Sequence, residues 1–155
     1  MNTYSRSTRE CTFADLNPEL VTAIRKHIEK YKFGDLESSF LICCETTSTT
    51  QKTGLFANDF ETIITGMIVT AQLLIWTNGK KRNRPAVRSA LLRNIDVQDF
   101  ENTAMYQVNP DSGMNITGRY TDVTKQGLAF VGLGTDSAGE KFRRVLQHAI
   151  QKAQS

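Results

Sequence analysis

The last part of the sequence, from Ser137 to about Ala153, carries the pattern that most restricts the fold. At about 100° per residue its apolar positions gather in one stripe about 140° wide, and charged or amide side chains fill the other side. Ser137 and Glu140 have the spacing of a capping box, which predicts where the helix begins. An amphipathic helix needs an apolar surface to pack on, so the rest of the domain must supply one. The stripe consists of Phe142, Val145, Leu146, Ala149, Ile150 and Ala153.

A second helix is predicted near the start of the chain, over 17–34. Asn17 suits the N-cap, Pro18 suits the first helical position, and Gly34 is a natural end. The polar residues 1–16 predict a flexible tail, and they lack the apolar core of a signal peptide. The sequence therefore predicts a tail and a helix ahead of the main body.

Between residues 38 and 134 the pattern changes to short β-prone runs, which turn signals separate at intervals of about 8–14 residues. This spacing is typical of an antiparallel meander or barrel. We therefore predict one domain over 17–155 of the mainly β with α (α+β) class. The expected strands are Phe40–Cys44 with a threonine-rich continuation, Thr62–Val69, Leu73–Thr77, Ala86–Leu92, Ile95–Val97 with an extension at Tyr106–Val108, Asn115–Thr121 and Leu128–Leu133.

This order of about seven strands followed by one amphipathic helix resembles the pleckstrin-homology-like (PH-like) superfamily, in particular its small bacterial members. Gly66–Trp76 is similar to the hairpin of the second and third strands of those domains. Leu91–Val97 looks like the segment that follows, and Gly127–Leu133 looks like the last strand. The resemblance implies a half-open barrel over 38–134, which the C-terminal helix 137–153 plugs at one end.

Two features that are usual in the eukaryotic members of this family are absent. The only tryptophan, Trp76, lies on an expected strand and not in the plug helix. The basic motif with which some members bind phosphoinositides is also missing, because only Lys52 lies in the corresponding loop. The resemblance therefore implies a binding domain without implying that it recognises inositol lipids.

Composition narrows the function further. No run approaches the ~20 apolar residues of a membrane span. Cys11, Cys43 and Cys44 cannot pair completely, which favours reduced thiols and a cytoplasmic protein. The cysteines and the two histidines lack the spacing of a metal site. We find no catalytic motif, so the sequence predicts a protein that is not an enzyme and that needs no cofactor.

The strongest candidate for a binding site is a cluster of basic side chains in one loop. Four of them lie between residues 80 and 84, and the net charge of +3 permits an anionic partner. The resemblance places the loops with Lys52 and Lys125 at the same end of the barrel, opposite the plug helix. We call this set the basic rim and expect it to bind a protein partner or an anionic ligand or surface. The basic rim consists of Lys52, Lys80, Lys81, Arg82, Arg84 and Lys125.

Three alternatives remain open at this stage. The charges at 80–84 can simply keep a hairpin tip in solvent. Strand edges, above all the threonine-rich stretch Thr46–Thr50, can pair with a second copy and make the protein a self-assembling scaffold. Weak nucleic-acid binding is less favoured, because the basic loop contains no aromatic residue. For an anionic partner, the inner face of the membrane is a second location beside the cytoplasm.

Overall fold

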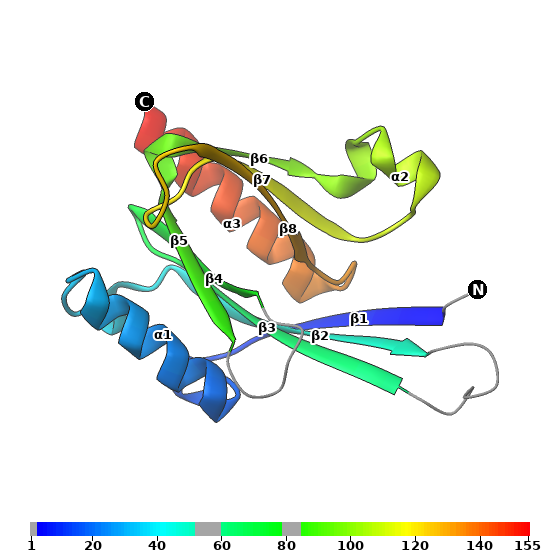
Figure 1. The fold of residues 1–155 in the computed structure, drawn as a ribbon, viewed down its shortest axis with the longest axis horizontal. Helices are drawn as coiled ribbons and strands as arrows, with labels where there is room; N and C mark the ends of the chain where they lie inside the picture. Colours follow the sequence, from blue (N-terminus) through cyan, green and yellow to red (C-terminus); the bar gives the residue numbers. More distant parts are fainter. Residues whose placement is uncertain (1–2, 52–59, 79–84) are drawn as a thin grey trace.

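The computed structural model describes residues 3–51, 60–78 and 85–155, and it shows a mainly β fold with helices (Figure 1). One antiparallel sheet has the order β1-β2-β3-β4-β5, and a second has the order β6-β7-β8. The α+β class is therefore confirmed. The strands are β1 (Thr3–Glu10), β2 (Ile42–Gln51), β3 (Phe60–Val69), β4 (Leu73–Asn78), β5 (Ala86–Leu91), β6 (Ile95–Asp99), β7 (Gly113–Arg119) and β8 (Gln126–Gly132), and the α-helices are α1 (Pro18–Lys30), α2 (Met105–Val108) and α3 (Ser137–Gln154).

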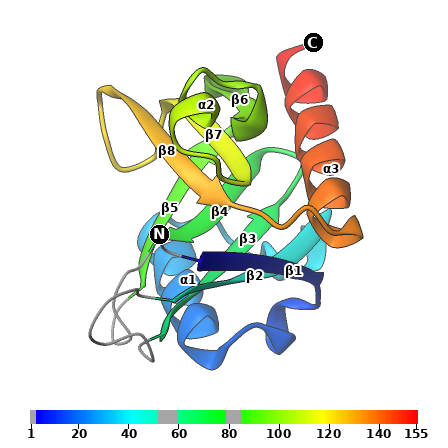
Figure 2. The same ribbon diagram turned by 90° about the vertical axis from the view of Figure 1, so that its right-hand side faces the viewer.

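The central part of the five-stranded sheet is buried on both faces, because α1 and α3 cover opposite sides of it (Figures 1 and 2). Consecutive residues of β3 alternate between two cores, as the pleat of a strand requires. Met67 and Val69 pack with α3 and the three-stranded sheet, whereas Ile68 packs with α1. The paired parts of β3 and β4 are therefore apolar on both faces, which explains the nearly continuous apolar run around Trp76.

The C-terminal helix is confirmed, and it buries the predicted stripe. Phe142 is 1% exposed, and it belongs to the larger core together with residues of both sheets. The predicted capping box is wrong. The N-cap is Asp136, whose backbone is extended while Ser137 is already helical. The Asp136 carboxylate accepts the N–H of Gly139 at 3.0 Å.

The N-terminal residues correct the prediction of a flexible tail. Thr3–Glu10 form β1, which pairs with β2 from Cys44 to Gln51. The hydroxyl oxygens of Thr8 and Thr46 lie 2.8 Å apart, and the Thr8 N–H donates to Asp136 at 2.8 Å. These partners are distant in the sequence, and the N-terminal segment is polar and has no apolar alternation. Its sequence therefore did not indicate a strand. Because β1 and β3 flank β2, the expected free edge at Thr46–Thr50 is also wrong.

Most other predicted elements are confirmed, with shifts of a few residues at their ends. The Asn17 side chain caps α1 by accepting the N–H of Glu19 at 3.1 Å. The expected strand at Tyr106–Val108 is wrong, because Met105–Val108 form the short helix α2. With β1, the described residues form eight strands where about seven were expected. No helix among the described residues is long and apolar enough to cross a membrane.

Candidate functional site

The structure describes one member of the basic rim. Lys125 is exposed in the turn between β7 and β8. The other five members, Lys52, Lys80, Lys81, Arg82 and Arg84, lie outside the described residues. The rim as a whole stays a prediction, and the described residues around it carry the structural argument.

Lys125 lines a hollow of about 440 Å³ together with Asn78 and Arg88. Asn78 ends β4 and is the last described residue before 79–84, the segment that contains four of the rim residues. Arg88, on β5, lies with its guanidinium carbon 5.8 Å from the centre of the Tyr120 ring. The hollow therefore joins the β7–β8 turn to the base of the basic loop. We call it the inter-sheet hollow, because residues of both sheets line it.

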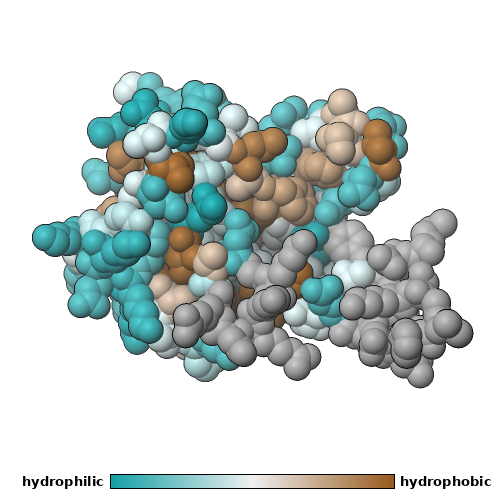
Figure 3. Space-filling model, in the orientation of Figure 1, coloured by the Kyte–Doolittle hydropathy of each residue, from teal (hydrophilic) through white to brown (hydrophobic). Residues whose placement is uncertain are grey.

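The inter-sheet hollow also has an apolar side. Leu128 and Phe130 on β8 line it, and Leu128 is 69% exposed. Figure 3 shows hydrophobic side chains gathered over the three-stranded sheet and near α2 on the same face of the molecule. Met105 and Val108 of α2 are 56% and 78% exposed. Exposed apolar side chains beside cations are typical of a surface that binds a protein segment of mixed character.

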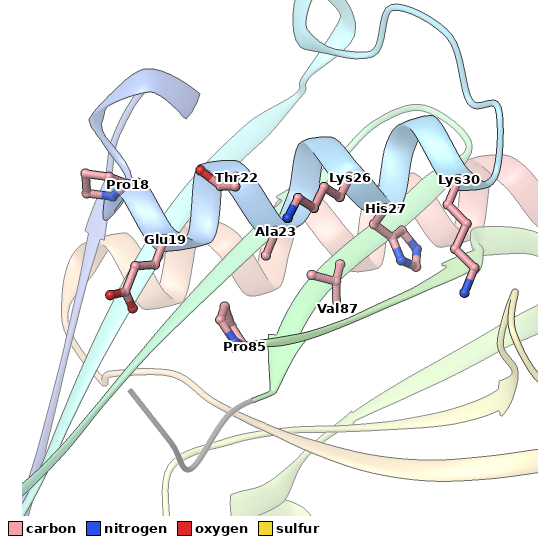
Figure 4. A pocket seen from close by; sticks show the side chains of 9 residues that line it. All are labelled: Pro18, Glu19, Thr22, Ala23, Lys26, His27, Lys30, Pro85 and Val87. Carbon is pink, nitrogen blue, oxygen red and sulfur yellow. The ribbon is translucent and has the colours of Figure 1, made fainter. Parts of the chain in front are cut away.

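A second hollow lies between α1 and β5 and has a volume of about 780 Å³. Figure 4 shows that Glu19 and Pro85 lie at one end of this α1–β5 groove, with Lys30 toward the other. Lys26 and Lys30 are exposed and one helical turn apart, so they share a face of α1. Their spacing was visible in the sequence, but only the packing of α1 on β5 shows that they flank a groove.

His27 lines the α1–β5 groove, and it joins α1 to β5. Its Nε2 lies 2.8 Å from Ser89 Oγ, and the Ser89 hydroxyl donates to Thr121 Oγ1 at 2.8 Å. Since Ser89 uses its hydrogen toward Thr121, His27 must donate its Nε2–H to Ser89. Burial lowers the pKa of His27, while Asp122 opposes that shift and so raises it. Ser89 is 0% exposed, so this pair fixes the helix against the strand and is poorly placed to attack a substrate.

The three cysteines are free, and Cys11, which follows β1, lies beside Cys43 of β2. The Cys11 N–H donates to the Cys43 carbonyl at 3.0 Å. Burial raises the pKa of Cys43, and it raises the pKa of Cys44 to about 12. Both thiols are therefore protonated near neutral pH, which makes them poor nucleophiles and poor metal ligands. No group of three or more His, Cys, Asp or Glu side chains in the described part of the chain could hold a metal ion.

Among the ion pairs of the described residues, the one with the least exposed cation ties α3 to the end of β6. Arg143 lies 2.8 Å from a Glu101 oxygen and 3.3 Å from an Asp99 oxygen. Burial is the largest single effect and lowers the pKa of Arg143, but the hydrogen bonds to Glu101 and the negative charges of Glu101, Asp99 and Glu140 together outweigh burial, so its pKa is raised. Two hydrogen bonds join the Arg143 guanidinium to Glu101. Arg143 Nε and Asp99 Oδ1 are buried without a hydrogen-bond partner among the described residues, and Asp99 contributes through its charge. We assign this cluster to the fold.

Comparison of the chain with protein-family models and with curated proteins gave no match.

Proposed function

We propose that this chain is a non-enzymatic binding module that takes up an acidic segment of a partner protein at the inter-sheet hollow and the basic rim. The observation that carries the proposal is that Lys125, Arg88 and Asn78 line one hollow. Asn78 directly precedes the basic segment 79–84 in the sequence, and Lys125 and Arg88 bring positive charge from two separate parts of the chain to the same hollow.

The apolar side of the hollow favours a protein segment over a bare anion. Leu128, Phe130 and Tyr120 line the hollow together with the two cations. A peptide that carries both carboxylates and apolar side chains can use both kinds of surface, whereas a headgroup or a free phosphate uses the charges alone.

The finer features of the fold belong to the same proposal. We propose that the two sheets form a PH-like half-open barrel, to which β1 and α1 are additions. The order of the strands and the position of α3 in the larger core support this arrangement. The free cysteines support a reducing compartment such as the cytoplasm.

Fluorescence anisotropy with a labelled peptide tests the proposal. The probe is acetyl-Glu-Val-Glu-Val-Glu-amide, and acetyl-Lys-Val-Lys-Val-Lys-amide is the charge control. We expect the acidic peptide alone to bind, with an affinity that falls as salt rises, because exposed charges are screened. Lys125→Glu should weaken binding by about fivefold, the equivalent of about 1 kcal/mol.

The matched control is Lys152→Glu, which makes the same charge change on α3 at a residue that lines neither hollow. A variant with Lys80, Lys81, Arg82 and Arg84 changed to Ala should also bind more weakly. Equal affinity for both peptides, or an equal loss in Lys125→Glu and Lys152→Glu, would contradict the proposal. Tight binding to phosphatidylserine vesicles without binding to the peptide would also contradict the proposal, and it would show that the basic rim binds a membrane surface.

A further inference from the structure

The inference concerns the outer edge of β5. In the five-stranded sheet, β5 pairs with β4 on one side and is the last strand on the other. The Thr121 N–H donates to the Ser89 carbonyl at 2.8 Å, so this carbonyl points away from β4. Residues two apart on an antiparallel strand point their backbone groups the same way. The N–H and C=O of Val87 therefore also point away from β4, toward the open edge.

The pairing at the far end of the hairpin agrees with this alternation. The Leu92 N–H donates to the Gln72 carbonyl at 2.8 Å, so even-numbered residues face β4 and odd-numbered residues face outward. Among the described residues, Thr121 closes the outer edge at Ser89, and no hydrogen bond reaches the outer side of Val87. The open part of the edge is therefore short, and Val87 supplies one donor and one acceptor.

Positive charge lies on both faces of this open edge. The Val87 side chain faces the α1–β5 groove, which Lys26 and Lys30 also line (Figure 4). Arg88, the next residue, faces the inter-sheet hollow with Lys125. A strand that paired with Val87 would place alternate side chains toward the lysines of α1 and toward Arg88. Glu19 also lines the groove near Pro85, but the two lysines leave this face with an excess of positive charge, so charge complementarity on both faces favours carboxylates.

We propose that an extended acidic segment of a partner protein adds to β5 as a short strand, exchanging two backbone hydrogen bonds with Val87. The inference rests on the proposed function for the acidic character of the partner, and it adds the mode of recognition. Thr121 occupies the place beside Ser89, so the added strand ends there. Backbone pairing then supplies affinity, while Lys26, Lys30 and Arg88 select the side chains.

The test uses the ¹⁵N-labelled full chain and the same acidic pentapeptide, followed by NMR. We expect the Val87 amide signal to shift on titration, together with those of Lys26 and Lys30. The pentapeptide with every amide N-methylated keeps its charge but has no backbone donor, and it should bind at least tenfold more weakly. On the protein, Val87→Pro removes the outward N–H at a position where an edge strand tolerates proline, and it should also cost at least tenfold.

The controls separate this inference from the proposed function. Val87→Ile keeps the N–H and should bind as the natural chain does. The methylated peptide needs no variant, so the result stands even where Val87→Pro disturbs folding. Full binding of the methylated peptide, with a loss in Lys125→Glu, would overturn strand addition and leave the proposed function intact. Failure of the acidic peptide to bind the natural chain would overturn both.

Discussion

Arg143 has the least exposed side chain among the ion pairs of the described residues, and it contacts two carboxylates at the junction of α3 and the second sheet. Its side chain is 6% exposed, whereas those of Asp99 and Glu101 are 28% and 27% exposed. Arg143→Ala would leave both carboxylates without their cation. Because they keep some contact with water, we expect a loss of about 2–3 kcal/mol, below the usual cost of breaking a fully buried pair. Urea unfolding measures this loss.

Arg143→Lys is the informative control for that change. Lysine keeps the positive charge but cannot reproduce the two-pronged contact of Arg143 with Glu101, whose oxygens accept at 2.8 and 3.2 Å. We expect a loss smaller than that of Arg143→Ala but still measurable. Equal stability of the natural chain and Arg143→Ala would show that the ion pair contributes nothing to the fold.

His27 should make the stability of the protein depend on pH. Burial lowers the pKa of His27 below its ordinary value of 6.5, and Asp122 and Lys30 modify that shift. The unfolded chain therefore binds the proton more readily than the folded one. Stability should be complete above the ordinary value and fall as pH drops through it, by at most about 1.4 kcal/mol per pH unit. The measurement is the free energy of unfolding at pH 7.5, 6.5 and 5.5.

The variant His27→Gln should flatten this part of the pH profile. The exposed His148, changed to Gln, is the matched control and should leave the profile unchanged. A profile that keeps its slope in His27→Gln would assign the pH dependence to another group.

At the scale of elements, α3 packs against both sheets and contributes to the core that they share. Phe142 is 1% exposed and packs in the core that both sheets share with this helix. Phe142→Ala should cost about 3–5 kcal/mol, because it removes a buried ring and leaves a cavity. Thermal or urea unfolding measures the cost, and Lys152→Ala at an exposed position of α3 is the control. A change near zero would show that the sheets do not depend on the helix.

The strand β1 is fastened to the start of α3 by Thr8. The Thr8 hydroxyl oxygen accepts the Gly134 N–H at 2.8 Å and lies 2.8 Å from that of Thr46. Thr8→Val keeps the shape but removes these bonds, and it leaves a buried N–H without a partner. The expected loss is about 1–3 kcal/mol, measured by urea unfolding. Thr8→Ser keeps the hydroxyl and should recover most of that loss.

At the scale of the whole molecule, the periodicity of the sequence predicted the elements that local sequence determines. It did not predict the element that depends on polar contacts between distant residues. The period of 3.6 predicted α3, and the turn at Thr70–Gln72 placed the β3–β4 hairpin correctly. The strand β1 could not be predicted, because its order comes from contacts such as that between Arg6 and Asp111, which are 105 residues apart. Without β1, the sequence assigned a free edge to Thr46–Thr50, so one omission caused the second error.

The candidate site, too, depends on contacts between distant parts of the chain that the sequence did not predict. The sequence singled out Lys125 and the 80–84 loop by charge alone. It missed Arg88, because a single arginine on a strand carries no signal until the partner sheet lies opposite it. It also missed the groove at Lys26 and Lys30, since the side of the sheet that α1 covers follows from packing and not from the helix itself.

The role of β1 as the cover of β2 leads to a prediction for the whole chain. A truncated chain that begins at Cys11 lacks β1, so one side of β2 would present its backbone N–H and C=O groups to solvent. We expect such a chain to keep most of its β-structure by circular dichroism but to associate. Its molar mass from light scattering should exceed that of the full chain and rise with concentration.

A charge placed on the exposed edge distinguishes edge pairing from general unfolding. Ser48 lies opposite Arg6 in the register of β1 and β2, so it becomes an edge residue in the truncated chain. Ser48→Lys in that chain should reduce association, because a lysine on an edge strand hinders pairing with another copy. If the truncated chain associates equally with and without this lysine, the association comes from misfolded protein. If it stays at the mass of the full chain at every concentration, β1 does not protect the sheet.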